Sequence, residues 1–263
     1  MPHSFSRVMS LTSRAQIVNR LINLFVHHFL RLLWHFLHLL VSLWYLQVCL
    51  VETTESYLIS TRLLKDYKAL DISKVQYLAI VIDSEDARQI SKVLQLLKWL
   101  AVVGVKHLCL YDSIGVLKTY KQIIIEKLNN AVLFEELVEK GLPMDSEKMS
   151  LEFASISDGK EAIARAANLL FMKHLKLSKS GVEQKELVFT EPEMDLALKA
   201  LGYRGPEPDL MLVYGPVRCH LGFSPWRLRY TEIAHMGPLK SMKYGSLIKA
   251  IYKFTTVRQN YGS

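Results

Sequence analysis

The sequence LAIVIDSEDARQ, residues 78–89, decides the fold class. It opens with five apolar residues, Leu78 to Ile82, and places Asp83 at the end of the strand that this run predicts. Enzymes built on parallel sheets carry their chemistry at this position, and phosphate-binding ones follow the strand with a glycine-rich turn. Here the turn reads Ser84-Glu85-Asp86-Ala87. The stretch therefore indicates an α/β fold whose phosphate site is either unusual or lost.

Apolar strands alternate with amphipathic helices along the rest of the chain. The predicted strands are residues 75–83, 105–112, 150–157 and 208–215, and the predicted helices are residues 85–104, 116–130, 158–175, 191–202 and 244–257. Gly104 marks the end of the first helix, and Asp158 with Glu161 forms a capping-box pattern at the start of the third. This alternation predicts an α/β fold with a parallel sheet covered by helices on both faces.

Composition narrows the class of partner. The chain has 263 residues, a formal net charge of +8 and 50% hydrophobic residues. The basic residues are scattered rather than clustered, which argues against nucleic-acid binding and suits an anionic membrane surface. The three cysteines, Cys49, Cys109 and Cys219, have neither the number nor the spacing of a disulfide framework or a zinc site.

The N-terminal region contains a long uncharged segment. Residues Leu32 to Val51 carry no formal charge over 20 residues, enough to span a bilayer core. Because no small-residue cleavage site follows, we expect an uncleaved anchor. The expected organisation is an N-terminal segment (1–31), a transmembrane anchor (32–51), a juxtamembrane linker (52–74) and an α/β domain (75–263).

Polar residues recur on one face of this predicted helix. They are His28, Arg31, His35, His38 and Ser42, at spacings of three and four residues. We interpret them as a polar stripe facing a partner helix or the headgroup layer, in preference to a metal site.

Membrane orientation is weakly encoded. Residues 1–31 carry four arginines and no acid, which taken alone would place the N-terminus in the cytosol and the domain in the lumen. Counting Lys and Arg only, the two flanks of the anchor differ by about one charge, too little to decide the topology.

Motifs for independent catalysis are missing from the sequence. It contains no G-x-G-x-x-G or Walker A motif, no serine elbow and no Cys–His pair with a local signature. Glu85 and Asp86 are expected in the first turn of a helix, where the helix dipole favours acids.

The segment PDLMLVYGPVRCHLGFSPWRLRYTEI, residues 208–233, carries a resemblance to a known family. The matching residues are Pro208-Asp209-Leu210, Gly215-Pro216-Val217, Leu221-Gly222-Phe223, Pro225-Trp226 and Thr231-Glu232-Ile233. Two further stretches, Tyr111–Gly115 and Asp158–Ala167, agree in the same order. The segment resembles the cis-prenyltransferase (undecaprenyl diphosphate synthase-like) superfamily, and within it the Nogo-B receptor branch of accessory subunits of dehydrodolichyl diphosphate synthase. The resemblance covers roughly residues 75–263 and the presence of an anchor.

The resemblance implies a degenerate catalytic site. Catalytic members follow the first strand with a sequence similar to MDGNGRWA, whose Asp holds Mg²⁺; here Asp83 is a remnant without the glycine turn. Their RTSGEQRLSNF clamp for isopentenyl diphosphate aligns with residues 213–223, where Val213 and Cys219 replace the two arginines. Arg218 is a neighbour, best interpreted as a solvated surface residue. We therefore expect no catalytic or metal-binding residue in this chain.

One substrate-binding element is implied by the same resemblance. In this branch the chain ends in an R-x-G tail that completes the site of the partner subunit. Here the end reads RQNYGS, in which Gly262 matches, Asn260 stands at the Arg position, and Arg258 lies two residues earlier. The Asn260 amide can donate hydrogen bonds but supplies no charge. The alternative is a frayed terminus without a role.

The function implied is that of a non-catalytic accessory subunit, active only within a complex. A catalytic cis-prenyltransferase subunit would hold Mg²⁺ and condense isopentenyl diphosphate with farnesyl diphosphate to make the polyprenyl diphosphate used for dolichol synthesis and protein glycosylation. We expect a single-pass endoplasmic reticulum protein with a cytosolic domain. The alternatives are a standalone cis-prenyltransferase with an altered site, and a membrane receptor or adaptor that uses the degenerate cleft.

Overall fold

The chain divides into two compact units, residues 1–55 and 56–263. The computed structural model describes residues 3–61, 63–64, 67, 70–139, 148–179 and 189–257.

The first unit consists of most of one long helix, α1 (His3–Ser60), whose last turn belongs to the second unit. Within the described residues one helical segment, Arg20–Ser60, is long and apolar enough to cross a membrane. It contains the predicted span, residues 32–51, and its side chains are exposed along that span. The predicted boundaries of the anchor and linker stay predictions.

The second unit is built on a parallel sheet of six strands. They are β1 (Leu78–Ile82), β2 (His107–Tyr111), β3 (Ala131–Leu133), β4 (Met149–Ala154), β5 (Leu210–Tyr214) and β6 (Glu232–Gly237). Their order is β3-β4-β2-β1-β5-β6, and every pair is parallel. The predicted α/β parallel fold is therefore confirmed. The edge strands β3 and β6 were not predicted, because neither contains a buried apolar run.

Helices join the strands as a parallel sheet requires. They are α2 (Ser84–Ala87), α3 (Ile90–Val103), α4 (Val116–Thr119), α5 (Lys121–Lys127), α6 (Phe134–Glu139), α7 (Lys160–Lys179), α8 (Glu191–Ala200) and α9 (Tyr244–Thr256). Short 3₁₀ turns are η2 (Ile72–Lys74), η3 (Ile156–Asp158), η4 (Pro225–Arg227) and η5 (Leu239–Ser241).

Several predicted helices differ in the structure. The helix predicted over residues 85–104 is divided into α2 and α3, with Arg88 and Gln89 between them. The helix predicted over residues 116–130 is broken at Tyr120 into α4 and α5. The third helix begins at Lys160, so the predicted Asp158–Glu161 capping box is wrong. The box belongs to η3 instead, where Ser155 and Asp158 exchange the two hydrogen bonds, because Asp158 turns back toward the end of β4. Gly104 ends α3 as predicted, in the left-handed conformation with φ 96°.

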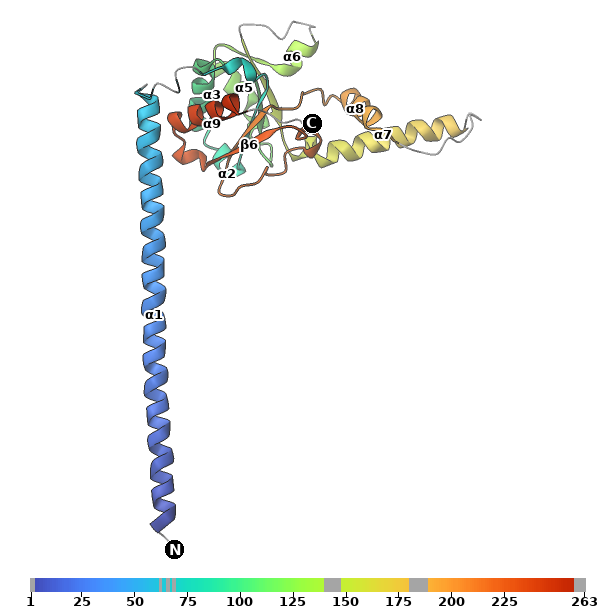
Figure 1. The fold of residues 1–263 in the computed structure, drawn as a ribbon. Coiled ribbons are helices and arrows are strands. Elements are labelled where there is room, and N and C mark those ends of the chain that lie inside the picture. Colours follow the sequence, from blue (N-terminus) through green and yellow to red (C-terminus); the bar gives the residue numbers. More distant parts are fainter. Residues whose placement is uncertain are drawn as a thin grey trace. The chain divides into compact units, whose positions relative to one another are not determined.

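Side chains alternate between the two faces of the sheet. On β1, Leu78, Ile80 and Ile82 join the larger apolar cluster with α3 and α9, whereas Ala79 and Val81 join the smaller one. The smaller cluster is covered by α6 and by the segment 221–228. Helix α7 packs on α8 and η3, and Figure 1 shows the pair projecting away from the sheet. The second face is thus covered mainly by a short helix and loop residues.

Candidate functional site

Four strands of the sheet end at one edge, where α/β folds place ligands. The residues that follow β1, β2, β4 and β5 are Asp83, Asp112, Ser155 and Gly215. Three carboxylates, Asp83, Asp112 and Asp158, lie at or just beyond this edge. What each one bonds to decides whether the edge can hold a cation or shape a phosphate site.

Asp83 is the residue that the sequence analysis kept as a remnant of a metal site. Its N–H donates to the carbonyl of Tyr214 (2.8 Å), and its side chain accepts from the N–H of Glu85 (3.3 Å) as the N-cap of α2. Where phosphate-binding α/β folds have a glycine-rich turn, this chain therefore has a helical turn that starts directly after the strand. Asp83 serves as the cap of this turn.

The two acids that follow Asp83 lie in the first turn of α2, as predicted. Asp86 accepts a hydrogen bond from the N–H of Leu239 through Oδ2 (2.8 Å), which fixes η5 against α2. Glu85 is exposed. Asp86 therefore has a structural partner, and Glu85 contributes an exposed negative charge that disfavours a diphosphate.

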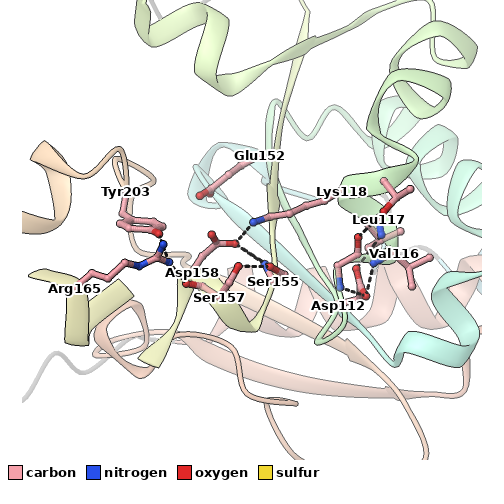
Figure 2. Close-up of polar contacts among 12 residues, drawn as sticks. Asp112, Val116, Leu117, Lys118, Glu152, Ser155, Ser157, Asp158, Arg165 and Tyr203 are labelled. Atoms are coloured by element: carbon pink, nitrogen blue, oxygen red, sulfur yellow. Dashed lines mark hydrogen bonds and ion pairs between the residues drawn. The ribbon is translucent and has the colours of Figure 1, made fainter. Parts of the chain in front are cut away.

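Asp112 is the most completely bonded of the edge carboxylates. It is fully buried and accepts from the N–H groups of Gly115 (2.7 Å), Val116 (2.8 Å) and Leu117 (2.9 Å). The hydroxyl of Ser84 donates to it at 3.3 Å. Figure 2 shows the carboxylate against the start of α4. It therefore holds the first turn of α4, which explains the Asp and Gly of the Tyr111–Gly115 motif.

Asp158 closes the loop after β4. Its Oδ2 accepts from the N–H of Ser155 (2.7 Å) and forms an ion pair with Lys118. Arg165 of α7 donates to the carbonyl of Ser157 (2.7 Å) and to the Tyr203 hydroxyl (2.7 Å), as Figure 2 shows. These contacts join α4, η3, α7 and the segment after α8 into one polar network.

Strand β5 and the segment after it carry the residues that stand at the predicted clamp positions. Val213 is 1% exposed and packs within the smaller apolar cluster, so it cannot contact a ligand in solvent. Arg218 and Cys219 are both exposed, in agreement with the surface interpretation of Arg218. The second clamp position thus offers a thiol in place of a guanidinium.

Tyr111 fixes the conformation of the same segment. Burial, with smaller effects from the neighbouring Asp112 and Asp158 carboxylates, raises the pKa of Tyr111 to about 12. The neutral hydroxyl donates to the carbonyl of Leu221 (3.1 Å), where the backbone turns through Leu221 (φ 49°) and Gly222 (φ 84°). A Cβ at Gly222 would lie 3.2 Å from this hydroxyl oxygen. The glycine of the Leu221-Gly222-Phe223 motif is therefore required by backbone geometry and close packing.

A buried ion pair joins β4 to η4. The guanidinium of Arg227 bonds the Glu152 carboxylate in a bidentate manner, at 2.9 and 2.7 Å, and both side chains are about 15% exposed. Tyr77 donates its hydroxyl to Glu152, and Arg227 also lies over the rings of Tyr77 and Phe223, 5.9 and 5.5 Å from their centres. The pair thereby fastens η4 to β4 and to the start of β1.

The electrostatics of this pair follow from its burial. Burial alone would raise the pKa of Glu152, but the Arg227 charge and its hydrogen bonds, with the Tyr77 hydroxyl, outweigh burial and lower it. Burial and the Glu152 charge together raise the pKa of Tyr77 well above its ordinary value. Glu152 is therefore ionised, Tyr77 is neutral, and the three side chains satisfy one another.

A cavity of about 480 Å³ lies next to this pair, between β4, α6 and the segment after α8. Its lining includes Lys118, Glu152, Phe153, Asp158, Tyr203 and Arg227. Neither Asp83 nor Val213 lines it. The cavity therefore reaches the edge at Asp158 but not at Asp83 or Val213, the positions where the resemblance places the diphosphate.

The described residues do not fit a metal ion at the edge. None of their His, Cys, Asp and Glu side chains form a group of three that could hold one. Asp83 caps α2, and Asp112 accepts three backbone N–H groups, so neither oxygen set is directed at a common point.

The predicted site residues fall into two groups. Asp83 lies at the edge as expected, whereas Arg258, Asn260 and Gly262 lie outside the described residues. The sequence analysis did not single out Asp112 or the Glu152–Arg227 pair. Asp112 could have been found, because it follows a predicted strand directly, but Glu152 and Arg227 are 75 residues apart in sequence and share no local signal.

Comparison with known proteins identifies the fold. No family model matches the chain. A solved structure, lavandulyl diphosphate synthase from Lavandula x intermedia in complex with dimethylallyl diphosphate, superposes with a TM-score of 0.52 at 15% identity, over 73% of this chain and 100% of that one. The fold is that of the cis-prenyltransferases.

The curated relatives of this cis-prenyltransferase-like chain are named as subunits of one complex. Dehydrodolichyl diphosphate synthase complex subunit NUS1 of Homo sapiens is 27% identical over 220 residues, covering 75% of this chain and 69% of the relative. The subunit of the same name from Saccharomyces cerevisiae is 26% identical over 203 residues, covering 62% and 51%. These similarities confirm the resemblance given above.

Proposed function

We propose that this chain is a non-catalytic accessory subunit of a heteromeric cis-prenyltransferase. The complex would make dehydrodolichyl diphosphate from farnesyl diphosphate and isopentenyl diphosphate, for dolichol synthesis and protein glycosylation. The observation that carries the proposal is the similarity, over 220 residues, to a named subunit of the dehydrodolichyl diphosphate synthase complex.

The edge of the sheet supports the non-catalytic part of the proposal. Asp83, Asp112 and Asp158 accept hydrogen bonds from their own loops, and Val213 is buried where a clamp arginine is expected. Among the residues that the structure describes, the edge therefore offers no group of three side chains for a cation and no arginine at the Val213 and Cys219 clamp positions. Mg²⁺ would be held mainly by the catalytic partner.

The surface of α7 supports a partner subunit. Its inner face packs Ala162, Ala166 and Leu170 against α8. Four large apolar side chains elsewhere on it are exposed: Leu169, Phe171, Met172 and Leu175, at 42, 46, 48 and 39%. A helix that projects from the sheet with exposed Leu, Phe and Met suits a subunit interface, where it would pair with a helix of the catalytic subunit.

The C-terminal tail is proposed to complete the partner's substrate site. Arg258, Asn260 and Gly262 would approach the diphosphate of isopentenyl diphosphate, with charge from Arg258 and N–H donors from Asn260 and the backbone. A variant lacking residues Asn260 to Ser263 tests the tail, and Arg258→Ala tests the charge separately.

The chain is proposed to be anchored in the endoplasmic reticulum membrane by α1, with its second unit in the cytosol where the diphosphate substrates are. The long apolar helix supports the anchor. Glycosylation tags placed at the C-terminus and at the N-terminus of the full chain test the orientation. Glycosylation of the C-terminal tag would refute a cytosolic domain.

The decisive experiment is a prenyl-transfer assay in membranes with labelled isopentenyl diphosphate, farnesyl diphosphate and Mg²⁺. The full chain is assayed alone, with a catalytic cis-prenyltransferase subunit from the same organism, and with that subunit after removal of the tail. Activity only in the pair supports the accessory role, and its loss with the tail supports the tail's part in the site. Activity of the chain alone would refute the proposal and make Asp83 the residue to mutate next.

A further inference from the structure

The polar stripe on α1 is longer than its first five members. Because α1 is one continuous helix, Tyr45 and Cys49 extend the stripe of His28, Arg31, His35, His38 and Ser42 at the same spacing of three and four residues. At about 1.5 Å per residue, the stripe from His28 to Cys49 is about 32 Å long, close to the thickness of a bilayer core.

The opposite face of the same helix is apolar. Leu30, Leu33, Leu37 and Leu40 repeat at the same spacing and point away from the stripe, and each is exposed. Gln47 is the polar residue that lies off the stripe, on the leucine side. Lipid tails can cover the leucine face, whereas the stripe presents a guanidinium, imidazoles and hydroxyls that lipid tails cannot satisfy.

The spacing of the stripe indicates a helix as its partner. A repeat of three and four residues averages 3.5, the period at which two α-helices stay in contact along a left-handed seam. A lipid phosphate would satisfy only groups at headgroup depth, but Ser42, Tyr45 and Cys49 continue the stripe across the apolar segment. A second helix can meet the stripe along its whole length.

Charge indicates what that helix must carry. Between Arg20 and Val51 the chain has Arg20 and Arg31 as formal charges and no acid. A second copy of this chain, inserted in the same orientation, would place Arg31 against Arg31, which is repulsive. Arg31 directly precedes the expected span, and a carboxylate at the same depth on a neighbouring helix can bind its guanidinium in a bidentate manner.

We propose that the stripe from His28 to Cys49 is the docking surface for a different transmembrane helix, one that carries an Asp or Glu at the depth of Arg31. The inference rests on the proposed anchoring of α1 in a membrane and is independent of the prenyltransferase activity. It assigns the anchor a second role, which is to recruit an integral membrane protein.

The test uses the full chain made in endoplasmic reticulum microsomes with a photo-cross-linking residue at one position. Stripe positions His35 and Ser42 are compared with the matched leucine-face positions Leu37 and Leu40. We expect discrete protein adducts from the stripe positions only, with the cross-linked peptide mapping to a helix that contains Asp or Glu. Arg31→Leu should lower the adduct yield at least about fivefold, and Arg31→Lys should retain most of it. Neutralising the partner's carboxylate should lower the yield as Arg31→Leu does.

Each other outcome overturns the proposal in a distinguishable way. Adducts to lipid alone would show that the stripe contacts headgroups, and adducts to a second copy would show self-association. Equal yields from both faces would show that no helix docks on the stripe in preference to the leucine face. A partner helix without a carboxylate, or a yield unchanged in Arg31→Leu, would refute the charge pairing. Alkaline carbonate extraction of the same membranes is the control for the anchor: release of the chain refutes the anchor and the seam together, whereas retention confines any failure to the seam.

Discussion

The buried pair of Arg227 and Glu152 predicts a large and pH-dependent loss of stability when its cation is removed. In Arg227→Met, the Glu152 carboxylate loses two hydrogen bonds of 2.9 and 2.7 Å. It stays buried on β4, next to Tyr77 at the start of β1. Leaving a buried carboxylate without its partner costs about 3–5 kcal/mol. Burial of both side chains places this pair in that range rather than among surface pairs, which contribute about 0–1 kcal/mol.

The pH dependence gives the sign that separates electrostatics from lost packing. In the parent the Glu152 pKa lies below its ordinary value of 4.5, so the pair's contribution is present above pH 4.5 and is lost as the pH falls through the folded-state pKa. In Arg227→Met the charge and hydrogen bonds of Arg227 are gone, so burial is opposed mainly by the Tyr77 hydrogen bond, and the Glu152 pKa rises relative to the parent. Protonation of Glu152 then removes the buried, unpaired negative charge of the variant. The difference in unfolding free energy between parent and variant should therefore shrink as the pH falls.

The assay is pulse proteolysis of the full chain in detergent micelles across a urea series. With a urea slope of about 2 kcal/mol/M, the expected midpoint shift at neutral pH is roughly 1.5–2.5 M. The matched control is Arg227→Met combined with Glu152→Gln, which keeps an acceptor for Tyr77 and should recover more than half of the loss. A single-variant loss below about 1 kcal/mol, or a double variant no more stable than the single one, would refute the reasoning.

Three further predictions follow from described contacts. Asp112→Ala should lower the unfolding free energy by about 3 kcal/mol or more, because three backbone N–H groups lose their acceptor, and the urea midpoint of the full chain measures it; an unchanged midpoint would contradict this. Gly245→Ala should lower the unfolding free energy by about 1–3 kcal/mol, because the added Cβ would collide with the Ser56 carbonyl. Amide hydrogen exchange in the last turn of α1 should then be faster, and an unchanged exchange rate would contradict the contact between Gly245 and Ser56. Burial raises the pKa of the Cys109 thiol, so iodoacetamide should modify exposed Cys219 on the order of 100-fold faster than Cys109, and equal rates before unfolding would contradict the burial.

Much of the fold could be predicted because its central strands are buried on both faces. Leu78–Ile82 and Leu210–Tyr214 are almost fully buried, so each appears in the sequence as an unbroken apolar run. The edge strand β3 has three half-buried residues, and β6 begins with exposed Glu232 and Ile233. Neither produces a buried run, so pairing with β4 and β5 defines them.

For the candidate site, the residue types could be read from the sequence, but the hydrogen bonds that they form could not. The turn after Asp83 has no glycine, and Val213 and Cys219 stand where the resemblance implies clamp arginines; both features are visible in the sequence. That Asp86 binds the N–H of Leu239, 153 residues away, is not visible. Such a bond depends on how η5 returns to α2, which is a property of the packed chain.

The sequence by itself determined the hydrophobic periodicity of strands and helices, the helix ends such as Gly104, and the residue types at the sheet edge beyond β1 and β5. Each of these is a local property of neighbouring residues. Only the tertiary structure decided what those residue types do. Burial leaves both carboxylates in need of donors: Asp112 takes three N–H groups from the turn that follows it, and Glu152 takes the guanidinium of Arg227, which the fold brings from 75 residues away.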